Sequence, residues 1–248
     1  MPAGNHHIPS RPCARIVRCG RLCAAIAVAV FVLVAALRPS TAAELISLDS
    51  GRPNLAVYLL NGSIAGGETL KLEAIVAKLP AGTTVAVILN SPGGSLGEGL
   101  SLGRFFHEAR IPTFVLGYGG SCYSACSLAF LGGRQGDGRP SRTKMTGSEL
   151  GFHQFRQART AEERNKKYSK TDMEQAALRT RATAMLIIQY LTDIGEDLSI
   201  LHLMLKAPAS DMTLLDNSEA VTYGINVMDE HTDQVIDASA VRARIQDR

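Results

Sequence analysis

The feature that most constrains this chain is a glycine turn between a short apolar run and a helical pattern. The run from Val85 to Leu89 is apolar and mostly β-branched, which favours a buried strand. Asn90-Ser-Pro-Gly-Gly94 ends the run, because proline lacks a backbone donor and paired glycines reach backbone angles closed to other residues. Apolar residues then recur at helical spacing, which predicts an amphipathic helix from Leu96 to Ala109. The chain is thus predicted to pass from strand to turn to helix.

A second segment of small residues follows the next predicted strand, Pro112 to Gly117. Gly119 to Gly133 begins with glycine and serine and continues as an apolar helix that two glycines close. A serine at the start of such a helix lies where unpaired backbone N–H groups and the helix dipole favour negative charge. With the N–H groups of the glycine turn, these are the parts of an acyl-transfer site that holds an oxyanion.

The same succession of strand, glycine loop and helix occurs once before this segment. Leu55 to Leu60 is typical of a strand, and Glu68 to Lys78 has helical periodicity. Repeated units of this kind predict an α/β fold in which stacked strand–turn–helix units form a parallel sheet core with helices outside. Further along, a short strand is predicted near Thr143 and a long helix from about Thr171 to Ile194.

Residues 1–43 differ in composition from the rest. Several arginines precede the apolar run Leu22 to Leu37, and the small residues Ser40 to Ala43 suit signal-peptide cleavage. The apolar run is about sixteen residues, at the short end of the roughly 17–25 that span a bilayer, so an uncleaved membrane anchor is the alternative. Residues 44–235 are therefore expected to form one domain in the periplasm or outside the cell, and residues 236–248 a polar tail.

The charge, the motifs and the cysteine content limit the kinds of ligand and cofactor that we expect. The net charge is only +3 at pH 7 and nucleic acid is not implied by it. No metal-ligand spacing is visible and the glycine turns lack the lysine of a phosphate loop, so neither metal nor cofactor is expected. Beyond the leader, Cys122 and Cys126 are expected either to form a disulfide in an oxidising compartment or to remain buried thiols. A helix running through both would strain a disulfide.

Several motifs occur in the order found in the proteolytic subunit of the Clp protease, within the ClpP/crotonase superfamily. They are Leu89–Gly94 with the helix after it, Tyr118–Ser124, Phe152–Gln154 and Glu219–Gly224. About residues 55–230 resemble this family, and the leader makes the chain similar to a ClpP-like envelope protein. The resemblance implies a serine hydrolase, most simply a peptidase, with a peptide or protein substrate and a homo-oligomeric assembly. No ATP-driven partner is expected in a compartment without ATP.

The resemblance also assigns the reacting groups. The family's nucleophilic serine precedes a closing glycine by nine residues, which maps onto Ser124. Its general base lies in an apolar-His-Gln pattern, which maps onto His153. The oxyanion would be held by the backbone N–H groups of Gly94 and Ala125. Helix polarity and glycine placement point independently to the same serine and donors.

The third member of the triad departs from the family's pattern. The position of the family's aspartate is Met212 in this chain, and Asp211 stands one place earlier. We assign Asp211 the role of orienting His153, with Asp216 and Asn217 as nearby alternatives.

Other readings stay open at this point. Cys122 as a thiol nucleophile lacks a paired base. A lysine could serve as the general base instead, and the candidates are Lys144, Lys166 and Lys167. All three lie in polar sequence, where a solvent-exposed lysine stays charged and cannot accept a proton. Acyl-CoA chemistry uses similar glycine turns, and a catalytically inactive binding or scaffold protein of the cell envelope is the alternative from a different functional class.

Overall fold

The structure, a computed structural model, describes residues 42–155, 169–208 and 210–241. Residues 1–41 of the expected leader lie outside these ranges. Within the described ranges, no helix has both the length and the hydropathy that crossing a membrane requires.

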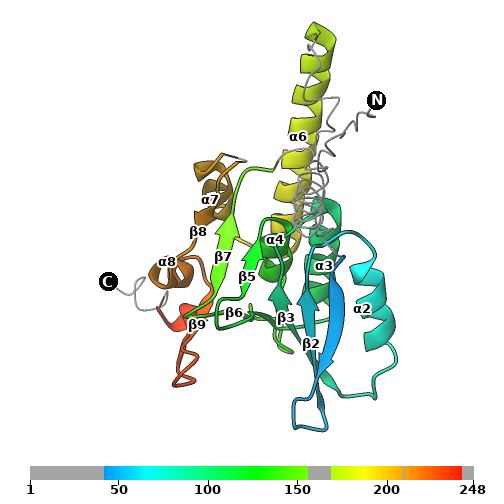
Figure 1. The fold of residues 1–248 in the computed structure, drawn as a ribbon, viewed down its shortest axis with the longest axis vertical. Helices are drawn as coiled ribbons and strands as arrows, with labels where there is room; N and C mark the ends of the chain where they lie inside the picture. Colours follow the sequence, from blue (N-terminus) through cyan, green and yellow to red (C-terminus); the bar gives the residue numbers. More distant parts are fainter. Residues whose placement is uncertain (1–41, 156–168, 209, 242–248) are drawn as a thin grey trace, which may run out of the picture. The chain divides into compact units, whose positions relative to one another are not determined.

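A seven-stranded sheet forms the centre of the described part, in the order β1-β2-β3-β4-β6-β9-β10 (Figure 1). Neighbours from β2 to β9 pair in parallel, whereas β1 and β10 pair antiparallel at the two edges. The predicted mixed α/β class with a largely parallel central sheet is confirmed. The strands are β1 (Glu44–Leu48), β2 (Leu55–Asn61), β3 (Thr84–Asn90), β4 (Thr113–Val115), β6 (Arg142–Met145), β9 (Asn226–Met228) and β10 (Val235–Ile236).

A smaller sheet contains β5 (Ser121–Tyr123), β7 (Glu149–Phe152) and β8 (Thr213–Leu214). Strand β5 pairs in parallel with β7, and β8 pairs antiparallel with β7. A parallel bridge from Ser91 to Cys122 connects β5 to the chain just after β3. The small sheet therefore brings the glycine turn after β3 beside the segment that leads into the serine helix.

Six helices lie in the described ranges: α2 (Glu68–Val76), α3 (Leu96–Glu108), α4 (Ala125–Leu131), α6 (Lys170–Asp193), α7 (Ile200–Lys206) and α8 (Asn217–Thr222). The helix predicted from Leu96 to Ala109 is confirmed as α3, with Ser95 as its N-cap accepting a hydrogen bond from the Glu98 N–H. Helix α3 lies against α4 so closely that a Cβ on Gly99 would be 2.5 Å from the Ala125 carbonyl oxygen. Glycine at this position thus allows the serine helix to pack on α3.

Helix α6 is packed only near its C-terminal end. Ile187, Tyr190 and Leu191 are buried, whereas Leu178 and Met185 are 61% and 69% exposed. Figure 1 shows the N-terminal part of the helix extending away from the sheets. Its start is stabilised by a capping box, in which the Ser169 and Asp172 side chains each bond the other residue's backbone N–H.

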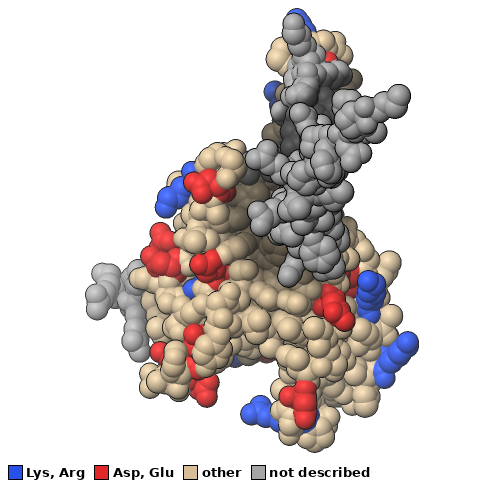
Figure 2. Space-filling view, in the orientation of Figure 1, with Lys and Arg blue, Asp and Glu red and all other residues tan. Residues whose placement is uncertain are grey.

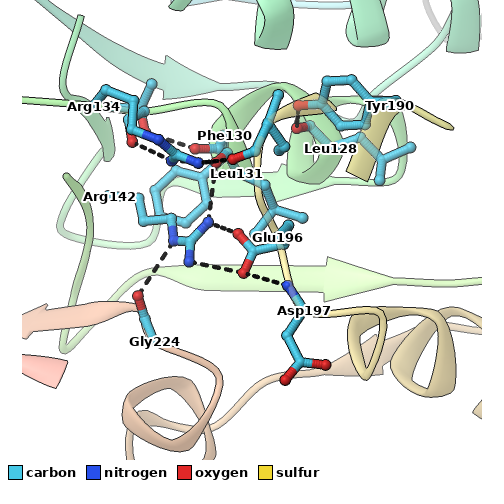
Figure 3. A network of polar contacts seen from close by, with 12 residues as sticks. Leu128, Phe130, Leu131, Arg134, Arg142, Tyr190, Glu196, Asp197 and Gly224 are labelled. Carbon is cyan, nitrogen blue, oxygen red and sulfur yellow. Dashed lines mark hydrogen bonds and ion pairs between the residues drawn. The ribbon is translucent and has the colours of Figure 1, made fainter. Parts of the chain in front are cut away.

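Three buried charged side chains connect the ends of the helices (Figure 3). The Arg142 guanidinium pairs with the Glu196 carboxylate and donates to the carbonyl oxygens of Leu131 and Gly224 at 3.0 and 3.2 Å. Arg134 donates to the carbonyl oxygens of Gly133 and Ile194. These bonds satisfy carbonyl groups at the ends of α4, α6 and α8 that would otherwise be buried without partners.

At the C-terminal side, the described body continues past the expected boundary at residue 235. Ile236 belongs to β10, and Ala238 is buried with 1% of its surface exposed. Its backbone N–H donates to the Asn226 side chain at 3.1 Å.

Candidate active site

Ser124 occupies a sharp turn between β5 and α4. It is the N-cap of α4 with φ 58° and ψ −119°, a backbone conformation that residues other than glycine rarely adopt. Such strain amounts to about 1–3 kcal/mol and persists only where surrounding structure enforces it. Here the Ser124 N–H donates to the Gly151 carbonyl oxygen at 3.1 Å, and its side chain makes no cap hydrogen bond. The turn thus presents the hydroxyl rather than using it to cap the helix.

A disulfide joins Cys122 and Cys126 across this turn. The sequence-based objection assumed a helix through both residues, but Cys122 lies in β5 and only Cys126 lies in α4. Their Cα atoms are 5.2 Å apart, within the usual range for bridged cysteines. Both cysteines are fully buried, so the disulfide lies on the interior side of the turn that carries Ser124.

The glycine turn after β3 lies directly against Ser124. A Cβ on Gly93 would be 2.5 Å from the Tyr123 carbonyl oxygen and 2.9 Å from the Ser124 Cβ. Gly93 and Gly94 have φ of 90° and 144°. Only glycine fits this conformation and this approach.

Two backbone donors at the turn are free. Within the residues that the structure describes, neither the Gly94 N–H nor the Ala125 N–H has a hydrogen-bond partner. The adjacent N–H groups of Ser95 and Ser124 do form backbone hydrogen bonds. The turn itself is fixed by bonds from the Ile64 N–H to the Gly93 carbonyl oxygen and from the Ser95 N–H to the Ile64 carbonyl oxygen. Both predicted oxyanion donors therefore stand unpaired beside the serine.

A cavity of about 480 Å³ opens at this point. Its lining combines the serine turn, the glycine turn and three segments distant in sequence. The lining residues are Pro92, Gly94, Leu96, Ser124, Ala125, Leu128, Phe152, His153, Phe155, Thr183 and Met204. Most of these residues are apolar, and His153 is the only one of them with an ionisable side chain.

The structure places His153 on the same cavity as Ser124, immediately after β7. No hydrogen bond joins its ring to the Ser124 hydroxyl among the described contacts. The Nδ1 atom of His153 is buried and has no hydrogen-bond partner. The fold thus brings the two side chains to one site without joining them.

No hydrogen bond or ion pair joins Asp211 to His153 among the described residues. Asp211 is exposed, and its Oδ1 accepts the Met212 N–H at 2.8 Å. The two alternatives have other partners. Asp216 is the N-cap of α8 and accepts the Glu219 N–H at 2.7 Å, while the Asn217 side chain accepts from Lys144. Asp211 as the group that orients His153 therefore has no contact to support it.

Lys144 corrects one expectation. It was predicted to lie in solvent, but it is 2% exposed because β6 lies between β4 and β9 inside the large sheet. Burial lowers the pKa of its amine, and its Nζ donates to the Asn217 side chain. Lys144 is not among the residues that line the cavity, and Lys166 and Lys167 lie outside the described residues.

Several residues of the site were not anticipated from sequence. Ser127 is fully buried and its hydroxyl donates to the carbonyl oxygens of Cys122 and Gly151, which fixes α4 to β5 and β7. Thr183 of α6 and Met204 of α7 form part of the cavity wall. No group of three or more potential ligands that could hold a metal ion occurs among residues 42–155, 169–208 and 210–241.

Comparison with known proteins does not assign the chain to a family. No protein-family model and no curated protein matches the chain.

Proposed function

We propose that this chain is an extracytoplasmic serine hydrolase, a peptidase of the ClpP type, with Ser124 as nucleophile. The observation that carries the proposal is the backbone of Ser124, strained at a helix N-terminus beside two unpaired N–H groups and facing a cavity. A serine that only capped its helix would bond the helix and would not need a positive φ. A serine held this way resembles the exposed nucleophile of other hydrolases.

The chemistry follows from these positions. The Ser124 oxygen attacks a carbonyl carbon while its proton passes to the His153 ring, and the oxyanion accepts hydrogen bonds from Gly94 and Ala125. His153 then gives the proton to the leaving amine, and water repeats the steps to release the acid. The bond between Ser124 and His153 has to form when substrate fills the cavity. Catalytic hydrogen bonds are often long in unliganded enzymes.

The order of strands and helices is compatible with the ClpP/crotonase superfamily and is not specific to it. Parallel strands β2, β3 and β4 follow one another in sequence and in space, with α2 and α3 as their connections. The segments after them stack a second time, as the bridges from Ile64 to Gly94 and from Ser91 to Cys122 show. This arrangement supports the ClpP/crotonase part of the proposal.

The cavity favours a substrate with an apolar side chain. Leu96, Leu128, Phe155 and Met204 line it, and no lysine or arginine is among the lining residues in the part of the chain that the structure describes. The phosphates of coenzyme A would need such cations, so acyl-CoA chemistry is disfavoured. On the face shown in Figure 2, charged side chains lie mostly toward the edges, and Lys and Arg do not gather into one patch.

The extracytoplasmic location is part of the proposal. It rests on the composition of residues 1–43 and on the Cys122–Cys126 disulfide, since disulfides persist in oxidising compartments. Sequencing the N-terminus of the mature protein would separate a cleaved signal from a tether through residues 22–37. Self-association follows from the family resemblance alone, and sedimentation of the mature protein tests it.

A fluorophosphonate probe tests the hydrolase proposal. We expect the probe to label the full chain and not to label the Ser124→Ala variant. Ser121→Ala, in the adjacent strand β5, is the control and should still be labelled. Labelling that survives Ser124→Ala, or the complete absence of labelling of the folded protein, would contradict the proposal.

A catalytically inactive binding protein is the second candidate. The absence of a hydrogen bond between Ser124 and His153, together with the unpartnered Nδ1, favours it. A crystal structure with a peptide in the cavity discriminates the two, because the inactive protein would keep an intact peptide bound without drawing the two side chains together.

A further inference from the structure

The pairing of β7 with β8 identifies the residue that stands opposite His153. Gly151 pairs with Leu214 and Phe152 pairs with Thr213 in antiparallel register. Extending this register by one residue places His153 opposite Met212. Directly opposed residues of antiparallel strands project to the same face, with Cβ atoms about 4.5–5.5 Å apart. By this register, position 212 faces His153 just beyond the paired ends of β7 and β8.

Met212 does project to that face. A Cβ on Gly151 would lie 2.6 Å from the Met212 Cγ and 2.8 Å from its sulfur, so the thioether lies over Gly151, on the face that Gly151 and His153 share. Asp211 is the neighbouring residue, which alternation directs to the other face, and it is exposed. The carboxylate is thus one residue out of register with the imidazole.

We propose that the site operates with two side chains, Ser124 and His153, and that residue 212 is the positioning residue that limits it. This inference rests on the hydrolase function proposed above. The buried Nδ1 of His153 has no acceptor, and the thioether of Met212 is at most a weak one. When Ser124 gives its proton to the ring, the second N–H of the imidazolium has no carboxylate to stabilise it or to fix the ring orientation.

The position also indicates how the site could be completed. An aspartate at 212 would place a carboxylate on the face of the sheet that His153 shares, and among the described residues that line the cavity His153 is the only acidic or basic one. The charge would stabilise the imidazolium and hold the ring through its Nδ1–H. Asparagine at 212 has the same shape without the charge and is the matched control.

The experiment compares the fluorophosphonate labelling rates of the full chain and of Met212→Asp, Met212→Asn and Asp211→Asn between pH 5 and pH 9. We expect Met212→Asp to label about tenfold faster, a part of the roughly 10⁴-fold that a triad aspartate contributes elsewhere. Its rate should also reach half-maximum at a higher pH, because the added charge stabilises the imidazolium. Met212→Asn, which lacks the charge, should not show this gain, and Asp211→Asn should label within twofold of the unchanged chain.

A second readout does not depend on activity. A far-downfield proton resonance, from an imidazole N–H bonded to a carboxylate, should appear in Met212→Asp and not in Met212→Asn. Loss of labelling in Asp211→Asn would overturn the inference, and so would a folded Met212→Asp protein with neither faster labelling nor the resonance. Absence of labelling in every variant, with the resonance present, would leave the register intact and defeat only the hydrolase function.

Discussion

The two sides of the candidate site differ in how firmly the fold holds them. The serine side comprises Gly93–Gly94 and residues 122–127, and it is fixed by a disulfide, two close glycine contacts and the bonds of Ser127. The histidine side comprises His153 and residues 211–213, where the buried Nδ1 of His153 has no hydrogen-bond partner among the described residues and Asp211 is exposed and bonds the Met212 N–H. The serine side is therefore preorganised, whereas the orientation of the His153 ring is not fixed by a hydrogen bond.

This difference indicates where catalytic strength would be lost or gained. Preorganised donors stabilise a transition state without reorganisation, and the serine side already provides them. A general base works best when a second group fixes its orientation, and the histidine side lacks one. Changes on the serine side should therefore disrupt the protein, whereas changes on the histidine side should leave its stability nearly unchanged.

The largest effect should follow from Gly93→Ala. The new Cβ would meet the Tyr123 carbonyl oxygen at 2.5 Å, at a φ of 90° that alanine disfavours. We expect a loss of about 3 kcal/mol in the free energy of unfolding and no measurable labelling. Denaturant unfolding measures the first quantity. Gly119→Ala is the control, because its φ is 86° with no atom near the new Cβ, and it should lose only about 1 kcal/mol.

Replacing both Cys122 and Cys126 by alanine should have the next largest effect. The bridge closes a short loop around the strained serine, and the chain-entropy model gives about 2 kcal/mol for a loop of this length. We expect a lower melting temperature and slower labelling of Ser124. If the alanine variant and the reduced unchanged protein both match the oxidised protein, the disulfide does not support the serine side.

Tyr190→Phe tests the outer support of the serine helix. The buried Tyr190 hydroxyl donates to the Leu128 carbonyl oxygen at 2.6 Å, and its loss should lower stability by about 1 kcal/mol (Figure 3). Burial raises the pKa of Tyr190 above its ordinary value of 10.0. The unfolded chain therefore ionises this tyrosine first, so its contribution is complete below about pH 10 and declines as the pH rises further. Unfolding at pH 7 and pH 11 should show a smaller decline in the phenylalanine variant.

The smallest effect is expected on the histidine side. Asp211→Asn removes a charge that is exposed and bonded only to its own neighbour, so unfolding should change by less than about 0.5 kcal/mol. A loss above 1 kcal/mol would mean that this side is held more firmly than its contacts indicate. Denaturant unfolding under the conditions used for Gly93→Ala gives the comparison.

Local patterns in the sequence were sufficient for the core elements. The run Val85 to Leu89 became β3, and the helix predicted to end at Ala109 ends at Glu108. Periodicity and capping act over a few residues, so the sequence itself contains this information. Strand β5 has only three residues, and its pairing with β7 is a contact between distant segments that no local pattern reports.

The site was predicted in part, for the same reason. The motif order led to Ser124 and His153, which the structure places on one cavity. It also showed that Asp211 stands one place before the family's aspartate position, but the register that gives this offset a structural meaning is set by pairing between β7 and β8, which local sequence does not report. The burial of Lys144 was not predicted because its polar neighbours suggested solvent, whereas β6 lies inside the large sheet and has consecutive buried residues on both faces.

Helix α6 is one continuous helix whose two ends face different conditions. From Ile187 onward one face of the helix, formed by Ile187, Tyr190 and Leu191, is buried in the core. The turns before Ala182 are mostly exposed and depend on backbone hydrogen bonds and the Ser169 cap. Isolated helical turns are marginal in water. Amide hydrogens at the N-terminal end should exchange with solvent through local fraying, while those near Tyr190 should exchange only when the whole fold opens.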